Sequence, residues 1–308
     1  MNKILITGGA GFIGSHLSAF LTREKNNYVY CIDNLITGNK ENIKDLLNCD
    51  NFEFIEHDIC NKIELEVNQI YNLACPASPV QYQKYPLETI EVNTTGIKNL
   101  LELSISCNAT ILQSSTSEIY GDPQVHPQDE SYFGNVNTFG IRSCYDEGKR
   151  LAETLFFNYL KIFDADIRIA RIFNTFGPKR QMNDGRVVSN FINQALNDEN
   201  ITVYGDGSQT RSLCYIDDMI TGLYALMNSS YKKPINLGND KEMSVLNLAN
   251  KILEKIPSKS QIIFEAFPDN DPKMRRPNIS KAQKNLNFYP SHSISDGLEK
   301  TINYFKEL

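Results

Sequence analysis

A cluster of glycines near the N-terminus constrains the fold more than any other feature of the sequence. An apolar run at residues 4–6 leads into it, and an amphipathic helical pattern follows it directly. Strand, tight turn and helix in this order are typical of the first unit of a dinucleotide-binding fold. The glycines allow the turn, the approach of a diphosphate and close packing of helix on strand, and the helix N-terminus offers free N–H groups. The predicted cofactor contacts in this stretch are Gly8, Gly11, Phe12, Ile13 and Gly14.

A second predicted strand, at residues 28–32, ends at Asp33. This acid lies about 20 residues beyond the glycines, where a carboxylate accepts hydrogen bonds from the adenosine ribose. A carboxylate there would repel a 2′-phosphate, so the sequence favours NAD over NADP. Asp33 could instead cap the end of the strand, but with the glycine cluster in place we prefer the cofactor interpretation.

Composition is that of an ordinary globular enzyme. The chain has 308 residues, of which 41% are hydrophobic and 22% charged, and its formal net charge of −6 argues against a nucleic-acid-binding surface. No apolar run approaches the roughly 20 residues that span a membrane, and the N-terminus is a predicted core strand rather than a signal peptide. We therefore expect a cytoplasmic protein that binds neither nucleic acid nor membrane.

Cysteine and histidine usage predicts no disulfide framework and no metal site. None of the seven cysteines belongs to a C-x-x-C pair, and several fall inside predicted strands or helices, which favours buried, reduced thiols. The four histidines lack the spacing of metal ligands. They are His16, His57, His126 and His292.

The order of predicted elements indicates an α/β fold. We expect a Rossmann-type, doubly wound parallel sheet with a smaller, partly interleaved α/β substrate-binding domain. The predicted domains are residues 1–173, which bind NAD, and 174–308, which mainly bind substrate, with parts of about 213–237 returning to the first domain. Further strands are predicted at 52–55, 69–74, 109–113 and 166–172, and long helices at 89–106 and 143–163.

A tyrosine and a lysine on the second long helix form the candidate catalytic pair. Tyr145 and Lys149 are four residues apart, so they share a helical face. An ammonium near a phenol favours the phenolate and lowers its pKa, which would suit Tyr145 to remove the proton of a sugar hydroxyl as hydride leaves. Thr116 follows the strand at 109–113, where its hydroxyl could bind the same oxygen. Together with the glycine turn, these residues predict an alcohol-oxidising site.

With the glycine turn, Thr116, Tyr145 and Lys149, the chain resembles the extended short-chain dehydrogenase/reductase family. Within that family, the resemblance is strongest to decarboxylases that act on UDP-glucuronate. It covers nearly the whole chain, and several of its stretches are much more specific than the glycine turn. The matching stretches are residues 7–17, 71–82, 114–122, 134–137, 142–155, 168–178, 184–196, 203–211 and 271–279.

The resemblance implies a role for individual residues. Thr116, Tyr145 and Lys149 match the family's catalytic triad, and Glu118 matches a carboxylate that orients the sugar and handles protons. Residues that the resemblance places against NAD, besides the glycine turn, are Asp33, Asn34, Asp58, Ile59, Leu73, Ala74, Asn93, Ser114, Tyr145 and Lys149. Those placed against the nucleotide sugar are Ser117, Glu118, Asn174, Val188, Tyr204, Gln209, Arg211 and Arg275. For Val188 and Tyr204, ordinary core packing is an equally good interpretation.

The implied reaction is oxidation of the C4 hydroxyl of UDP-glucuronate by NAD, loss of carbon dioxide and return of the hydride to give UDP-xylose. Ser117 stands where dehydratases of the family carry an acid, which disfavours 4,6-dehydration. An alternative is a C4 dehydrogenase or epimerase acting on another GDP-, UDP- or dTDP-linked sugar, for example in surface-polysaccharide synthesis. A remote alternative is a non-catalytic NAD-binding regulator.

Some positions depart from the family's pattern. Phe133 stands in place of a tryptophan, Lys179 and Arg180 in place of Arg-Met, and Leu213 in place of a phenylalanine. The first two departures lie in loops expected near the sugar and the diphosphate, so a different sugar, nucleotide or end product stays open. The resemblance also implies a homodimer, formed through the helices at 89–106 and 143–163.

Overall fold

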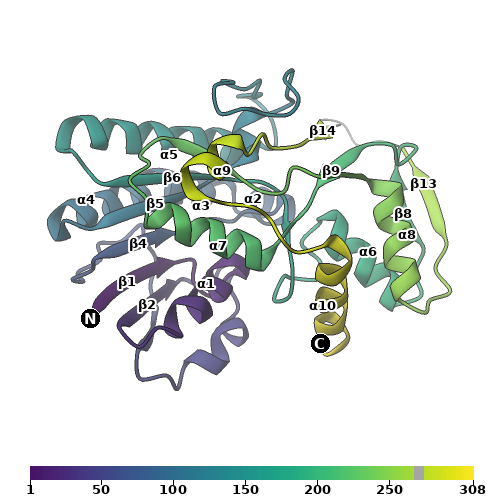
Figure 1. Cartoon of the computed structure of the whole chain (residues 1–308), viewed down its shortest axis with the longest axis horizontal. Coiled ribbons are helices and arrows are strands. Elements are labelled where there is room, and N and C mark those ends of the chain that lie inside the picture. The colour runs from purple at the N-terminus through teal and green to yellow at the C-terminus, as the bar shows by residue number, and fades with distance from the viewer. Residues whose placement is uncertain (267–273) are drawn as a thin grey trace.

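A parallel sheet of seven strands forms the centre of the computed structural model, which describes residues 1–266 and 274–308 (Figure 1). The strands lie in the order β11-β6-β5-β4-β1-β2-β3, and each pairs in parallel with its neighbours. The predicted doubly wound sheet is confirmed. The strands are β1 (Asn2–Thr7), β2 (Asn27–Asp33), β3 (Phe52–Glu56), β4 (Gln69–Asn72), β5 (Thr110–Thr116), β6 (Ile167–Ile172) and β11 (Pro234–Leu237).

The apolar run of β1 is buried on both faces of the sheet. Ile4 and Ile6 pack into one hydrophobic cluster, whereas Leu5, which points the other way, packs into a second. This is why the strand reads as continuously apolar rather than alternating. The first cluster includes residues of α1 (Phe12–Thr22) and α7 (Ile216–Met227), and the second includes residues of α4 (Ile97–Cys107) and α5 (Ser143–Phe163).

Beyond β6 the chain builds a smaller region beside the carboxyl ends of the strands (Figure 1). Here β8 (Ile201–Tyr204) pairs with β13 (Ile262–Glu265), and β9 (Thr210–Ser212) lies between β12 (Glu242–Ser244) and β14 (Met274–Arg275). β7 (Thr175–Phe176) pairs with β10 (Cys214–Tyr215). The helices after β6, besides α7, are α6 (Val187–Leu196), α8 (Val245–Lys255), α9 (Ser280–Leu286) and α10 (Ile294–Lys306).

The two regions interleave along the chain, because α7 and β11 return to the large sheet after β10. β11 pairs with β6 at the edge of that sheet, within the segment predicted to return. The division into domains at residue 173 stays a prediction.

Two predicted elements differ in detail from the structure. The strand expected at 109–113 continues to Thr116, because residues 114–116 also pair with β6. The helix expected at 89–106 consists of α3 (Pro86–Glu91), a π-helical turn η2 (Val92–Gly96) and α4. The other short helices are η1 (Lys40–Leu46), α2 (Pro79–Lys84) and η3 (Ser117–Tyr120).

Candidate active site

A cleft lies at the carboxyl ends of the central strands, the edge where open α/β sheets bind ligands. It consists of two adjoining cavities that share Gly8, Gly11, Leu73 and Cys75 as walls. One cavity reaches the end of β2, where Asp33 is predicted to bind the cofactor, and the other reaches α5, which carries Tyr145 and Lys149. The cleft therefore connects the predicted cofactor site with the predicted catalytic residues. Its walls include the predicted cofactor residues Gly8, Gly11, Phe12, Ile13, Gly14, Asp33, Asn34, Asp58, Ile59, Leu73, Ala74, Ser114, Tyr145 and Lys149.

The glycine turn has one side packed and one side open. Gly8 has a φ of +66°, and a Cβ at Gly14 would lie 2.2 Å from the Gly8 carbonyl oxygen, so neither position accepts a side chain easily. A Cβ at Gly11 would meet nothing within 4 Å except that same oxygen, at 3.1 Å. Gly11 is the N-cap of α1, whose first turn contains no acidic residue. The free N–H groups of the helix therefore face open space in the cleft, and this cradle fits a diphosphate.

Alanine at Gly14 and alanine at Gly11 are expected to have different effects. Gly14→Ala forces backbone apart and should lower the free energy of unfolding by about 1–3 kcal/mol, with loss of NAD binding. Gly11→Ala keeps an ordinary φ of −75°, so it should weaken NAD binding with little loss of stability. Urea unfolding and calorimetric NAD titration of both variants test this. Equal loss of stability in the two variants would contradict it.

Asp33 caps the end of β2 and also lines the cleft, and its contact with the cofactor ribose stays a prediction. Its carboxylate accepts the backbone N–H groups of Ala10 at 3.0 Å and Leu35 at 2.9 Å, so it caps the strand end. It also lines the cleft beside Asn34, whose amide donates to Asp58 at 2.9 Å. Burial raises the pKa of Asp33 above its ordinary value, and its two backbone hydrogen bonds act in the opposite direction.

Asn93 lies behind the wall of the cleft. Its amide donates to the Thr89 carbonyl at 2.8 Å and contacts the Cys75 sulfur at 3.2 Å, and its buried Oδ1 has no hydrogen-bond partner among the described residues. A Cβ at Gly148 of α5 would come within 3.2 Å of the same amide. Contact between Asn93 and the cofactor stays a prediction.

The three predicted catalytic residues line one cavity together. Thr116 ends β5, and Tyr145 and Lys149 share one face of α5. The Tyr145 ring is buried and stacks on Tyr82 of α2, with ring centroids 5.1 Å apart and planes 10° from parallel. The Lys149 ammonium lies 5.9 Å from the centroid of the Tyr145 ring and donates to the Ser114 carbonyl at 3.0 Å. The lysine is therefore fixed between the tyrosine and the end of β5.

In the protein without cofactor or substrate, burial dominates the pKa shifts of Tyr145 and Lys149. It raises the pKa of the Tyr145 hydroxyl above its ordinary value, although Thr116 and the charge of Arg186 act in the opposite direction. It also lowers the pKa of the Lys149 ammonium. The expected lowering of the Tyr145 pKa by the lysine is thus not seen, because excluding water from the phenolate outweighs the attraction of the ammonium. A lowered pKa needs further positive charge in the cleft, and the oxidised nicotinamide ring would carry one.

Glu118 is held by two arginines from distant parts of the chain. Arg275 of β14 forms a bidentate ion pair with its carboxylate, with one contact at 3.0 Å, and Arg142 before α5 pairs with the same group. We call these three residues the carboxylate clamp. Burial alone would raise the pKa of Glu118, but the two guanidinium groups outweigh it and hold the pKa well below its usual range. Glu118 is thus ionised, and the clamp carries a net positive charge near Tyr145, the predicted catalytic base.

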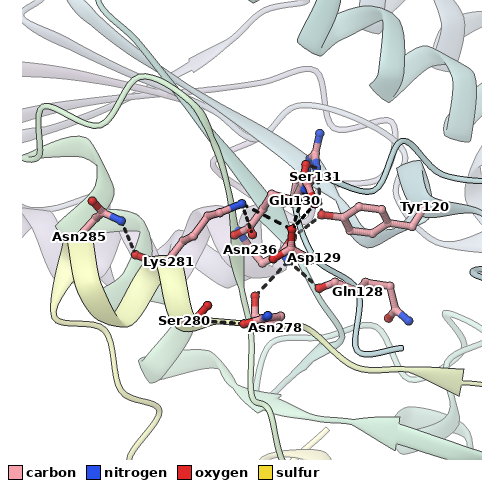
Figure 2. Close-up of polar contacts among 11 residues, drawn as sticks. Tyr120, Gln128, Asp129, Glu130, Ser131, Asn236, Asn278, Ser280, Lys281 and Asn285 are labelled. Carbon is pink, nitrogen blue, oxygen red and sulfur yellow. Dashed lines mark hydrogen bonds and ion pairs between the residues drawn. The ribbon is translucent and has the colours of Figure 1, made fainter. Parts of the chain in front are cut away.

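A buried hydrogen-bond network near the clamp contains Tyr120, Asn236 and Gln128 (Figure 2). Tyr120, at the end of η3, donates to the Asn236 side chain on β11 at 2.8 Å. The Asn236 amide donates to the Gln128 carbonyl at 3.0 Å. Gln128 bonds both main-chain groups of Arg276, through its N–H and its side-chain oxygen, at 2.8 Å each. Because Arg276 adjoins Arg275, the network fixes the backbone that carries one guanidinium of the clamp.

Asp146 is a second carboxyl group beside the clamp. It lies in the first turn of α5, 3.6 Å from the Arg142 guanidinium, and its buried Oδ1 has no hydrogen-bond partner among the described residues. Burial and the charge of Glu118 raise its pKa to about 7, whereas Arg142 and Arg275 act in the opposite direction. Near neutral pH this group therefore changes the charge next to Tyr145.

The Asp146→Asn variant is expected to lose a pH dependence that the natural protein has. Because the folded pKa lies above the ordinary value, the protonated carboxyl stabilises the fold at low pH, and this contribution is lost as the pH rises through about 7. Relative to the variant, the free energy of unfolding of the natural protein should therefore fall by roughly 1 kcal/mol or more between pH 5 and pH 8. Urea unfolding at both pH values measures this, and a constant difference would contradict it.

The residues predicted to bind the nucleotide sugar are spread over two parts of the structure. Ser117, Glu118 and Asn174 line the cavity that contains Tyr145, and Arg275 joins it through the clamp. The remaining four lie outside the walls of both cavities. Val188 is buried in α6, Tyr204 ends β8, Gln209 donates to the Tyr204 carbonyl at 2.7 Å, and Arg211 of β9 lies opposite Arg275 of β14. The matching stretch 271–279 has its first three residues outside the described part of the chain.

Sequence reasoning missed several residues that line the cavity or contact its lining residues. Tyr82 and Arg142 fell within matching stretches but received no role. Arg180 and Arg186 line the same cavity. The available signal for Arg142 was its position one helical turn before Asp146, which places two opposite charges on one face.

Two searches bear on the kind of site. Over residues 1–266 and 274–308, no group of three or more His, Cys, Asp or Glu residues could hold a metal ion. No helix in the same residues is both long and apolar enough to cross a membrane.

Comparison with known proteins agrees with this geometry. UDP-glucuronic acid decarboxylase 1 of Xenopus tropicalis is 49% identical, over 99% of this chain and 72% of its own length. UDP-glucuronic acid decarboxylase 6 of Arabidopsis thaliana is 51% identical, over 96% of this chain and 86% of its own length. The structure of UDP-glucuronic acid 4-epimerase from Bacillus cereus, in complex with UDP-glucuronic acid and NAD, has a TM-score of 0.89 at 30% identity and covers 99% of both chains.

The sequence model of one family covers most of the chain. It matches residues 4–238, which contain the glycine turn, the seven strands of the large sheet except the first two residues of β1, and Thr116, Tyr145 and Lys149. Together with relatives at 49–51% identity, this match places the chain in the NAD dependent epimerase/dehydratase family.

Proposed function

We propose that this protein is an NAD-dependent UDP-glucuronate decarboxylase that forms UDP-xylose. The observation that carries the proposal is the net positive carboxylate clamp, whose Glu118 lines the same cavity as Tyr145 and whose excess positive charge suits a sugar that bears a carboxylate. The identity of 49–51% to UDP-glucuronic acid decarboxylases, over nearly all of the chain, supports the same substrate.

The proposed reaction begins at the C4 hydroxyl of the sugar. Tyr145 removes the hydroxyl proton, and Thr116 orients the hydroxyl oxygen. The positive charge of the Lys149 ammonium lies beside the phenol of Tyr145. NAD, when bound along the glycine turn, would accept the C4 hydride and return it after carbon dioxide has left. The other predicted cofactor residues would hold its ribose and diphosphate, and binding along both cavities suits a cofactor that is recycled in place.

Decarboxylation follows from the chemistry of the oxidised sugar. A C4 ketone makes the C6 carboxylate a β-keto acid, so the C5–C6 bond breaks and its electrons pass into an enolate. Protonation at C5 then restores the ketone. In this proposal the clamp orients the carboxylate. Ser117 offers no acid for the loss of a hydroxyl group, which argues against dehydration.

Incubation of the purified protein with UDP-glucuronate tests the proposal, with carbon dioxide and nucleotide sugars as readouts. Carbon dioxide release with UDP-xylose formation is the expected result. Release with accumulation of a 4-keto pentose would keep the decarboxylation but show weak hydride return. Formation of UDP-galacturonate without carbon dioxide would make the protein a 4-epimerase, the activity of the Bacillus cereus relative. No turnover would exclude UDP-glucuronate as substrate.

We also propose a homodimer in a reducing, cytoplasmic compartment. The seven cysteines are free thiols, which suits that compartment. Light scattering should give about twice the 35.0 kDa mass of one chain. The supporting surface is a set of exposed apolar side chains on α3 and α5, namely Leu87, Ile90, Leu151, Phe157, Ile162 and Phe163.

A further inference from the structure

Arg180 is a buried cation whose charge is not fully compensated by the described residues around it. Its side chain is 10% exposed and lines the same cavity as Gly11 and Gly14. The guanidinium carbon lies 4.4 Å from the centroid of the Phe12 ring, and Phe12 is the first residue of α1. Arg180 thus lies next to the open end of that helix.

The carboxylate of Asp184 is shared by two arginines, Arg180 and Arg186. Asp184 accepts from Arg180 at 3.1 Å and lies 3.8 Å from Arg186. The buried Nε atoms of both arginines have no hydrogen-bond partner among the described residues. Burial and the charge of Arg186 lower the pKa of Arg180 to about 9, although Asp184 acts in the opposite direction. A buried guanidinium with an unused donor costs free energy unless an anion reaches it.

We propose that Arg180 binds the bridging diphosphate of NAD, opposite the N–H groups of α1. The inference deepens the proposed function, since it assigns one more residue to the cofactor. Two features favour this diphosphate over that of the nucleotide sugar: Arg180 packs on Phe12, and it lies beside the glycine turn. A guanidinium in this position adds charge-assisted hydrogen bonds to those of the helix N-terminus.

Lys179 provides a matched control on the same loop. It is also partly buried, but its ammonium donates to the Asn42 carbonyl of η1 at 2.6 Å. Lys179 also lines the cavity, so Lys179→Met removes one positive charge from the same wall. Arg180→Met instead removes the guanidinium that packs on Phe12 and keeps an unbranched side chain over that ring.

The test measures binding by calorimetry, so it does not depend on turnover. Titrations of both variants use NAD, ADP-ribose, adenosine and UDP. Arg180→Met is expected to lower the affinity for NAD and for ADP-ribose by roughly 10- to 100-fold and to leave the affinities for adenosine and UDP unchanged. Lys179→Met is expected to leave the NAD affinity within about 3-fold of the natural protein.

Two results would overturn the inference. Unchanged NAD and ADP-ribose affinity in Arg180→Met would show that the guanidinium does not contact this diphosphate. Weakened UDP binding with unchanged NAD binding would assign Arg180 to the nucleotide sugar instead. The thermal midpoint of Arg180→Met without ligand shows whether this variant is folded. Arg180→Lys, which keeps the charge without the planar fork, is compared with the natural protein if Arg180→Met does not fold, and it should also bind NAD more weakly than the natural protein.

Discussion

Replacing Tyr145 by phenylalanine is expected to lower kcat with UDP-glucuronate by about 10²- to 10⁴-fold, the usual contribution of a general acid–base group. The ring stays stacked on Tyr82, so the packing of the cavity is kept and only the hydroxyl is lost. NAD affinity should change little, because only one hydroxyl is lost from a cleft whose walls include many other residues predicted to bind NAD. Single-turnover assays that follow reduction of the bound NAD measure the oxidation step directly.

Tyr82→Phe is the matched control for this prediction. Its ring lies parallel to that of Tyr145, and its buried hydroxyl has no hydrogen-bond partner among the described residues. Removing that hydroxyl should leave kcat within about 3-fold of the natural protein. If Tyr145→Phe instead kept natural turnover, another group would be the base. If it kept the biological activity of the protein, the non-catalytic NAD-binding regulator would be the better interpretation.

The parts of the fold and site that could be predicted are those encoded by local pattern. β1, the glycine turn and α1 follow each other without a gap, so their identity needs no knowledge of tertiary structure. Thr116 and Tyr145 meet for a topological reason. Carboxyl ends of parallel strands lie at one edge of the sheet, and α5 packs against β5, so a strand-end residue and a helix residue reach the same cavity.

The carboxylate clamp could not be predicted in this way. Glu118 and Arg275 are separated by 157 positions along the chain, and neither hydrophobic periodicity nor spacing records which distant charges meet. Family resemblance assigned both residues to the substrate, yet the structure pairs them with each other and adds Arg142. The direction of the Tyr145 pKa was missed for a related reason. Burial, which decides it, is a property of the folded cavity and not of a Tyr–Lys spacing.

Replacing Glu118 by glutamine is expected to stop decarboxylation and to lower the free energy of unfolding by about 3–5 kcal/mol, because two buried guanidinium groups lose their shared counter-charge. The side chains of Glu118 and Arg275 are 15% and 9% exposed, so water compensates little. Since the folded pKa of Glu118 lies below its ordinary value, its stabilising effect is present above about pH 4.3, the usual glutamate pKa. It is lost as the pH falls through the lowered value.

Urea unfolding and carbon dioxide release of Glu118→Gln, with Glu147→Gln as control, test this prediction. Glu147 lies on α5 in a half-exposed ion pair with Arg150 at 3.6 Å. Its substitution should therefore lower the free energy of unfolding by less than about 1 kcal/mol. Adding Arg275→Met to Glu118→Gln should recover part of the lost stability, because it removes one of the uncompensated charges. It should not recover turnover. Additive losses in the double variant would show that the two residues do not interact, and the carboxylate clamp would then lose its role in the fold.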